Sequence, residues 1–224
     1  MSEPTFGRAF LLRHGETEWS REGRHTGRSD LPLTVRGEDQ ARDAREALAG
    51  MRFAEVVSSP LGRALRTAEL AGFPGPVVDP HLVEWDYGPV EGLSTPEVRE
   101  ELGSLWDIWI DGVDVAVDPG RADARREAAG AGPSPAPGRP HGETVVEVGR
   151  RAGAVVRRIL PALHDGQDVL LVAHGHLLRV LTAVWLGLDP ADGAHFALET
   201  AAVSTLAFER DRHVLAGWNV HHRD

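Results

Sequence analysis

Short apolar runs alternate along the chain with segments of helical periodicity. Runs that are apolar on successive residues predict strands covered on both faces, because a strand with one wet face would alternate apolar and polar residues. The segments expected as strands are 9–12, 54–57, 77–78, 169–173, 203–208 and 213–218. Most of them are separated by a helical segment, which favours parallel neighbours.

Helices are expected between these strands. Thr34 is a favourable N-cap with Glu38 in the first turn, and Ser59 followed by Pro60 predicts the start of a second helix. The expected helices are about 35–51, 59–72, 94–111, 143–163 and 177–188. Within 94–111, Trp106 and Trp109 are expected in the core or in a cavity wall.

This order of elements predicts an α/β fold, with a mainly parallel sheet between two layers of helices. A chain of 224 residues can form one domain, residues 1–224, with a sizeable core. Residues 118–140 are rich in Ala, Gly, Pro and Arg, and their prolines exclude a regular helix. We therefore expect a Pro/Gly/Ala-rich insertion at about 112–140, at the surface and partly mobile.

Charge and composition exclude several classes of protein. The chain has 34 acidic and 24 basic residues, a net charge of −10 and no basic run, which argues against nucleic acid and anionic membranes as partners. No apolar run is long enough for a signal peptide or a spanning helix, so we expect a cytoplasmic protein. The absence of cysteine removes thiolate nucleophiles and cysteine metal sites.

Unusual polar residues follow three of the expected strands. Arg13-His14-Gly15 ends the first, Ser58-Ser59-Pro60-Leu61-Gly62-Arg63 follows the second, and His174-Gly175-His176 follows the strand at 169–173. Carboxyl ends of parallel strands share one edge of a sheet, so two arginines and two histidines are expected around one crevice. Helix starts at Ser59 and Gly175 would add N–H donors, which together favour phosphate. A neutral histidine is then the plausible nucleophile, and Glu84 a candidate proton donor.

Four ordered segments resemble the motifs of the histidine phosphatase superfamily, also called the phosphoglycerate-mutase-like family. They are LLRHGET at 11–17, SSPLGRALRTA at 58–68, VEWDYGPVEG at 83–92 and LLVAHGHLLRVL at 170–181. The resemblance covers nearly the whole chain except 112–140, and it is closer to the phosphatase branch. It implies a three-layer αβα sandwich and a reaction that needs no metal or other cofactor.

The resemblance also implies roles for individual residues. His14 matches the phosphorylated nucleophile, Glu84 the general acid and base, and Arg13, Arg63 and His174 the groups that hold the phosphoryl oxygens. Because His14 must be neutral to attack, its other ring nitrogen is expected to donate a hydrogen bond. Protonation of Glu84 at the moment of attack predicts a neutral to acidic pH optimum.

Other positions have two interpretations each. Ser20 and Thr26 stand where much of the family has Asn and Gln, so they either contact phosphate or cap their loop. Arg28 and His25 either recognise the rest of the substrate or are solvated. Arg28 is taken as a candidate for substrate specificity, and solvation is favoured for His25. His174 and His176 could suggest a metal pair, but no carboxylate motif completes such a site. The segment at 141–144 resembles the family's glycine–glutamate–serine segment before a helix. Thr144 or Gly142 is expected to cap that helix, with Glu143 in its first turn, and this is favoured over a catalytic role.

The leading hypothesis is a metal-independent phosphomonoesterase that acts on a small phosphorylated metabolite, for example a sugar phosphate. Phosphoglycerate mutase is the first alternative, but residues 93–140 do not resemble the longer segment of the mutases. A phosphate-binding module without catalysis is the second. The leaving group and the oligomeric state, including a homodimer, stay open at this point.

Overall fold

The computed structural model describes residues 5–118, 120–136 and 138–221, so the ends of the predicted domain and positions 119 and 137 of the insertion lie outside the described residues. Within the described ranges, six strands form one sheet in the order β3-β2-β4-β1-β5-β6. The strands are β1 Ala9–Arg13, β2 Glu55–Ser58, β3 Val77–Val78, β4 Val169–Ala173, β5 Val203–Glu209 and β6 Arg212–Val220. The first four in this order are parallel, whereas β5 and β6 are antiparallel, which confirms the mainly parallel sheet.

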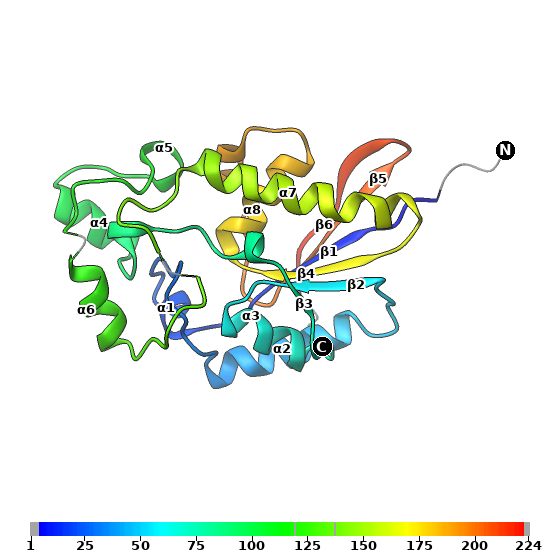
Figure 1. Ribbon diagram of the computed structural model, residues 1–224, viewed down its shortest axis with the longest axis horizontal. Coiled ribbons are helices and arrows are strands. Elements are labelled where there is room, and N and C mark those ends of the chain that lie inside the picture. The colour runs from blue at the N-terminus through cyan, green and yellow to red at the C-terminus, as the bar shows by residue number, and fades with distance from the viewer. Residues whose placement is uncertain (1–4, 119, 137, 222–224) are drawn as a thin grey trace.

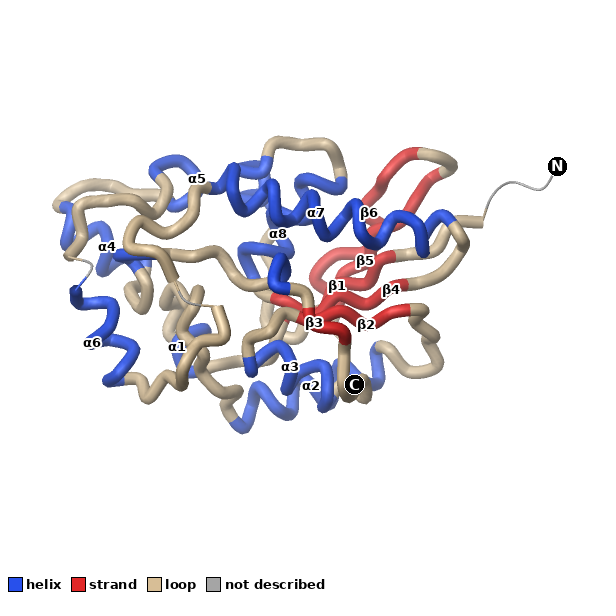
Figure 2. The backbone as a smooth tube through the Cα atoms, viewed as in Figure 1, coloured by secondary structure: helices blue, strands red, loops and turns tan. Residues whose placement is uncertain are grey.

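Helices cover both faces of the sheet, as Figures 1 and 2 show. The helices are α1 Glu18–Arg21, α2 Val35–Ala47, α3 Gly62–Leu70, α4 Thr95–Leu102, α5 Ile108–Asp111, α6 Gly120–Ala128, α7 Val145–His164 and α8 Gly175–Trp185, with 3₁₀ turns η1 Pro80–Leu82, η2 Gly88–Val90 and η3 Pro190–His195. Alternate residues of β1 point to opposite faces. Phe10 and Leu12 join the core beneath α2 and α3, and Leu11 joins the core beneath α7 and α8. The molecule is therefore the predicted three-layer αβα sandwich.

The helix starts follow from local capping. Thr34 accepts a hydrogen bond from Gly37 N (3.0 Å) at the start of α2, as predicted. Thr144 and Glu147 form a reciprocal capping box at the start of α7. The expected start at Ser59 is wrong, because α3 begins at Gly62 and the Ser59 hydroxyl has other partners.

The segment between η2 and α7 differs most from the prediction. Residues 94–111 form two short helices rather than one, because Gly103 ends α4 in a left-handed conformation with φ of 64°. The expected insertion contains α6, which precedes the prolines that were thought to exclude it. Arg125 of α6 donates hydrogen bonds to Glu91 O (2.9 Å) and Pro89 O (2.8 Å), so this part of the insertion is anchored to η2.

Figure 1 shows α1, α4, α5 and α6 gathered beyond one end of the sheet. This is the end at which the parallel strands terminate, since α1 follows β1 and α8 follows β4. Open α/β sheets bind ligands at that end. None of the helices within the described ranges is both long and apolar enough to cross a membrane.

Candidate active site

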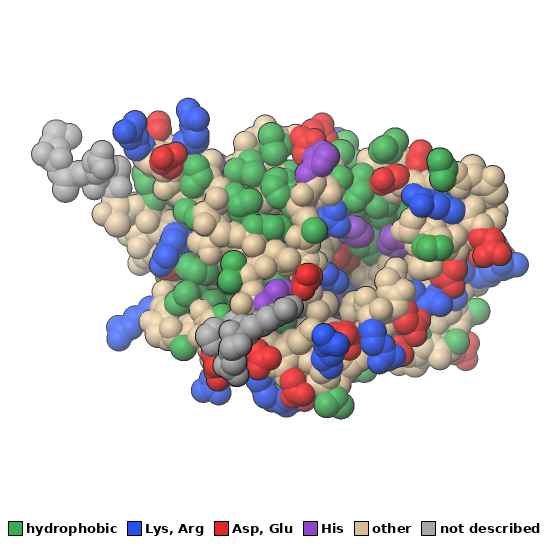
Figure 3. All heavy atoms as spheres, turned by 180° about the vertical axis from the view of Figure 1, so that it is seen from behind, with side chains coloured by type: hydrophobic (Ala, Val, Ile, Leu, Met, Phe, Trp, Pro, Cys, Tyr) green, Lys and Arg blue, Asp and Glu red, His purple; other side chains and the backbone are tan. Residues whose placement is uncertain are grey.

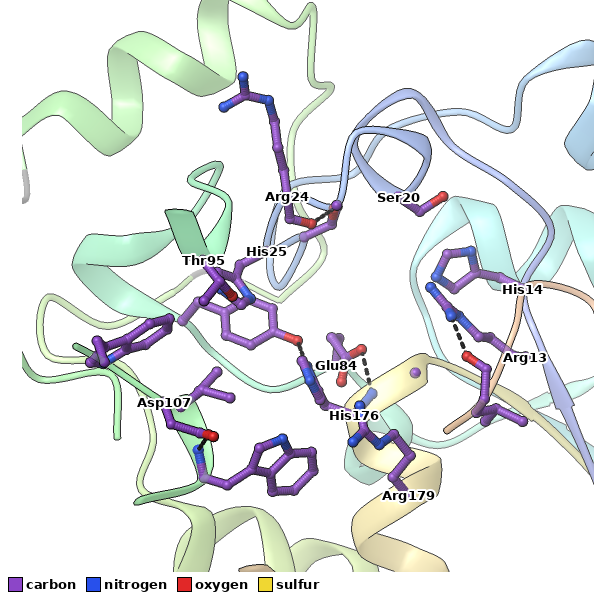
Figure 4. A pocket seen from close by; sticks show the side chains of 18 of the residues that line it. Arg13, His14, Ser20, Arg24, His25, Glu84, Thr95, Asp107, His176 and Arg179 are labelled. Atoms are coloured by element: carbon purple, nitrogen blue, oxygen red, sulfur yellow. Dashed lines mark hydrogen bonds between the residues drawn. The ribbon is translucent and has the colours of Figure 1, made fainter. Parts of the chain in front are cut away.

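A cavity of about 410 Å³ opens at the C-terminal ends of β1 and β4. Six of the nine predicted site residues line it, namely Arg13, His14, Ser20, Thr26, Glu84 and Gly175. Figure 4 shows His14 and Arg13 on one side of this cavity and Glu84 between them and His176. Figure 3 shows histidine side chains at a hollow of the molecular surface, with basic side chains beside it.

The ring of His14 has a defined protonation state. Its Nδ1 lies 2.7 Å from the carbonyl oxygen of Gly15, which can only accept, so Nδ1 carries the proton and Nε2 keeps its lone pair. Burial, together with the charges of Arg63 and Arg13, lowers the pKa of His14 well below 6.5. The imidazole is therefore neutral, as a nucleophile must be. A Cβ at Gly15 would lie 2.2 Å from Gly37 O, so only glycine fits after this histidine.

Two further predicted residues lie behind His14 and are fully buried. The rings of His14 and His174 have centroids 5.1 Å apart. Arg63 Nε donates to His174 Nδ1 (3.2 Å), so His174 must carry its proton on Nε2, which donates to Ser59 Oγ (2.7 Å). Burial and the charge of Arg63 lower the pKa of His174 well below 6.5, so this ring is neutral too.

The other nitrogens of Arg63 hold the backbone of the loop at 26–29. Nη1 donates to Ser29 O (2.7 Å), and Nη2 donates to the carbonyls of Thr26 and Gly27 (both 3.0 Å). The buried Glu91 carboxylate accepts from the amides of Gly27 and Ser29 on the same loop. One arginine thus connects this loop, which carries Thr26 to the cavity, with His174.

Arg13 reaches the cavity from the end of β1. Its Nη1 donates to Leu198 O (2.5 Å), while its Nε is buried without a hydrogen-bond partner. A Cβ added at Gly175 would lie 3.3 Å from Cζ of Arg13, so glycine leaves the space that the guanidinium occupies. Arg13 therefore has hydrogen-bonding capacity left for a ligand.

Glu84 lies at the N-terminus of α8. One carboxylate oxygen accepts from Trp85 N (2.8 Å) and Leu177 N (2.9 Å), and the other from His176 N (3.0 Å). The amides at the start of α8 were expected to bind an external anion, but in this structure those of His176 and Leu177 hold the Glu84 carboxylate. The contact places a titratable oxygen inside the cavity, opposite His14.

The remaining predicted residues either line the cavity with hydroxyls bonded to their own loop or lie away from it. Ser20 Oγ exchanges hydrogen bonds with Thr17, and Thr26 Oγ1 donates to Arg24 O (3.1 Å), so both hydroxyls serve their loop while lining the cavity. Arg28 is buried away from the cavity, 3.1 Å from Glu143 Oε2. The expectation that His25 is solvated is wrong, because only 8% of its surface is exposed.

The far wall of the cavity contains aromatic rings and one arginine, among them Tyr87 and Arg179, for which the sequence predicted no role. His176 Nδ1 is hydrogen-bonded to the hydroxyl of Tyr87, and His25 stacks on His176 with centroids 6.2 Å apart. The guanidinium of Arg179 lies 4.6 Å from the ring of Trp109 and donates to carbonyls of η3. Trp109 and Trp106 form cavity wall, as expected. Tyr87 lies three residues after Glu84, and Arg179 lies three residues after His176. This spacing is the feature of the sequence that could have indicated both residues.

The two strand-end histidines do not form a metal pair, since His174 contacts Ser59 and Arg63 whereas His176 contacts Tyr87. Among the residues that the structure describes, no group of three or more His, Cys, Asp or Glu side chains is placed to hold a metal ion. The positive charge in this site comes from guanidinium groups.

The fold and site are those of an α/β protein with a buried neutral histidine in an arginine-lined pocket at the strand ends. A family description, Histidine phosphatase superfamily (branch 1), matches residues 9–221, and the chain belongs to this family. An acid phosphatase of Mycobacterium tuberculosis is 37% identical, over 93% of this chain and 90% of its own length. Sedoheptulose 1,7-bisphosphatase of Saccharomyces cerevisiae is 32% identical, over 81% of this chain and 68% of its own length. The solved structure of the open reading frame Rv3214 from Mycobacterium tuberculosis superposes with a TM-score of 0.79 at 36% identity, covering 96% of this chain and 98% of that one.

Proposed function

We propose that this protein is a metal-independent phosphomonoesterase that hydrolyses a small phosphorylated metabolite through a phosphohistidine on His14. The hydrogen bond from His14 Nδ1 to Gly15 O carries the proposal, because it leaves the lone pair of Nε2 free on a ring that lines a cavity with Arg13 and Arg179. The names of two relatives, acid phosphatase and sedoheptulose 1,7-bisphosphatase, support phosphate-ester hydrolysis and favour a sugar-sized substrate.

In the first step the lone pair of His14 Nε2 attacks phosphorus, and the bond between phosphorus and the ester oxygen breaks. Protonated Glu84 gives its proton to the departing oxygen, so the products are phosphohistidine, the alcohol and the Glu84 carboxylate. Arg13 stabilises the negative charge on the equatorial oxygens, with Arg63 and His174 behind the ring of His14.

In the second step the Glu84 carboxylate takes a proton from water, whose oxygen attacks phosphorus. The bond between nitrogen and phosphorus breaks, which returns neutral His14, protonated Glu84 and free phosphate. The same groups thus serve both steps. The rings and Arg179 on the far wall of the cavity surround the space left for the alcohol part of the substrate.

The test is release of phosphate from a panel of phosphomonoesters by the wild type and by His14→Ala. We expect turnover on at least one sugar-sized ester and its loss in the variant, while His141→Ala, which removes an exposed histidine, keeps the wild-type rate. Labelling with a phosphate-labelled substrate, quenched in alkaline detergent because the phosphorus–nitrogen bond is labile in acid, should trap a phosphohistidine in the wild type. Full activity of His14→Ala would overturn the proposal, and loss of activity after EDTA treatment would overturn its metal-independent part. Interconversion of 2- and 3-phosphoglycerate without net hydrolysis would indicate a mutase instead.

A further inference from the structure

The segment that carries Glu84 has no regular structure of its own. Residues 84–87 belong to no helix or strand and follow the short η1 turn. The position of the Glu84 backbone must therefore be set by contacts from other elements. Many of those contacts come from Glu143, two residues before α7, and from Arg151 in α7. We call this pair the Glu143–Arg151 clamp.

Arg151 binds the carbonyl groups on the N-terminal side of this segment. Its Nη1 donates to His81 O and Val83 O (both 2.8 Å), and its Nη2 donates to Glu84 O (3.2 Å). Carbonyls on three residues thus converge on one planar guanidinium. A lysine ammonium is a point charge on a flexible stem and would not reproduce this arrangement.

Glu143 binds the C-terminal side of the same segment. Its carboxylate accepts from Asp86 N (3.1 Å), its backbone amide donates to Asp86 O (2.9 Å), and its carbonyl accepts from Trp85 Nε1 (2.7 Å). Residues on both sides of Glu84 are therefore held by Glu143 and Arg151, while the Glu84 carboxylate is held by amides of α8.

The two members of the clamp fix each other. Arg151 Nε lies 2.9 Å from one oxygen of Glu143 and Arg151 Nη2 lies 2.9 Å from the other, in a bidentate pair. Glu143 is 1% exposed, and burial alone would raise its pKa, but Arg151 and then Arg28 hold that pKa below its ordinary value. The carboxylate is thus an anion, and the neighbouring guanidiniums compensate its charge.

We propose that Glu143 and Arg151 are positioning residues that set the reach of Glu84 toward the departing oxygen. The inference rests on the role of Glu84 as general acid. Neither residue lines the cavity, so they act through Glu84 rather than by contact with substrate. A misplacement of about 1 Å in a reacting group costs about 100-fold in rate.

Substrates whose leaving groups differ in basicity distinguish a residue that positions Glu84 from a residue that only stabilises the fold. An alkyl phosphate needs protonation of its departing oxygen, whereas p-nitrophenolate leaves without it. The value of kcat/KM covers phosphoryl transfer to His14 and excludes the later hydrolysis of phosphohistidine. For Glu143→Gln we expect kcat/KM to fall about 100-fold on glycerol phosphate and less than about 3-fold on p-nitrophenyl phosphate.

Arg151→Lys should lose kcat/KM on glycerol phosphate with the same selectivity. If Glu143→Gln does not fold, the test relies on Arg151→Lys alone. The matched control is Arg158→Gln, which removes another α7 arginine that pairs with Glu55 and Asp79 and does not contact residues 81–86. The control should keep both values of kcat/KM. Equal losses on both substrates in the clamp variants would overturn the inference.

A double-mutant cycle with Glu84→Gln completes the test. If the clamp acts through Glu84, adding Glu143→Gln to Glu84→Gln lowers kcat/KM on glycerol phosphate by less than about 3-fold more. Full additivity would overturn the positioning role. If Glu84→Gln alone shows no dependence on the leaving group, the assignment of Glu84 as acid fails; if Glu84→Gln is selective and the clamp variants are not, only the clamp fails.

Discussion

Arg63 donates a hydrogen bond from Nε to Nδ1 of His174 over 3.2 Å, and neither side chain is exposed to solvent. This contact keeps Nδ1 of His174 without a proton and directs Nε2–H to Ser59. Because the same guanidinium binds carbonyls of the 26–29 loop, the protonation state of His174 and the position of the cavity loop depend on one residue.

Replacing Arg63 with lysine should therefore damage both stability and activity. Lysine keeps the charge but cannot donate to His174 and to three carbonyls at once, so a buried cation is left with fewer partners. We expect the free energy of unfolding to fall by about 3 kcal/mol, measured by urea denaturation. We also expect kcat/KM to fall at least 100-fold in the fraction that folds. A stability within about 0.5 kcal/mol of the wild type would contradict this account.

Adding a methyl group at Gly175 tests the position of Arg13. The new Cβ would lie 3.3 Å from Cζ of Arg13, whose Nη1 is already bonded to Leu198 O, so the guanidinium must shift by a few tenths of an ångström. Alanine is well tolerated in the first turn of a helix, so stability should change by less than about 1 kcal/mol. For Gly175→Ala we expect weaker inhibition by inorganic phosphate and about a 10-fold lower kcat/KM. Unchanged affinity for phosphate would show that Arg13 does not bind it.

The sequence predicted the positions of those candidate site residues that lie at the ends of regular strands. Arg13 ends β1, and His14 and His174 directly follow β1 and β4; such parallel strands bring their ends to one edge whatever the rest of the chain does. The expected sheet and its flanking helices were confirmed for the same reason, since the apolar runs and the helical spacing are local patterns.

The residues that sequence reasoning misplaced depend on loops that pack against distant loops. His25 is buried because its segment pairs with residue Leu93, and Arg28 is removed from the cavity by its pairing with Glu143, 115 residues away. Ser59 does not cap α3, because the helix begins only at Gly62 and the Ser59 hydroxyl accepts from His174 Nε2 and Leu61 N instead. No local periodicity encodes such contacts, so composition and spacing could not predict them.

Arg179 tests the chemistry of the leaving group. Its guanidinium lines the cavity, and its Nε and Nη2 bind the neutral carbonyls of Gly193 and Ala194, so its positive charge is not cancelled by those partners. Arg179→Gln should raise KM about 10-fold for esters whose alcohol carries a carboxylate or a second phosphate. KM for p-nitrophenyl phosphate should change less than about 3-fold. Equal effects on both kinds of ester would mean that Arg179 does not select the leaving group.

His25 should make the protein less stable in mild acid. Burial lowers the pKa of His25 from 6.5 to about 4, and its Nε2 is buried without a hydrogen-bond partner. Between these two pKa values the unfolded chain binds a proton that the folded protein does not, so stability falls as the pH falls below about 6.5. From pH 8 to pH 5 this one group should cost about 2 kcal/mol.

His25→Phe removes the titrating group and keeps a ring against Tyr87 and Trp106, with no hydrogen bond of Nε2 to lose. Urea denaturation at pH 8 and pH 5 should show that the variant loses about 2 kcal/mol less than the wild type over this interval. The comparison uses the difference between the two pH values, so any change in packing at pH 8 cancels. An identical loss in both proteins would mean that His25 is protonated in the folded state as readily as in the unfolded chain, and its burial among aromatic rings would then have no effect on its charge.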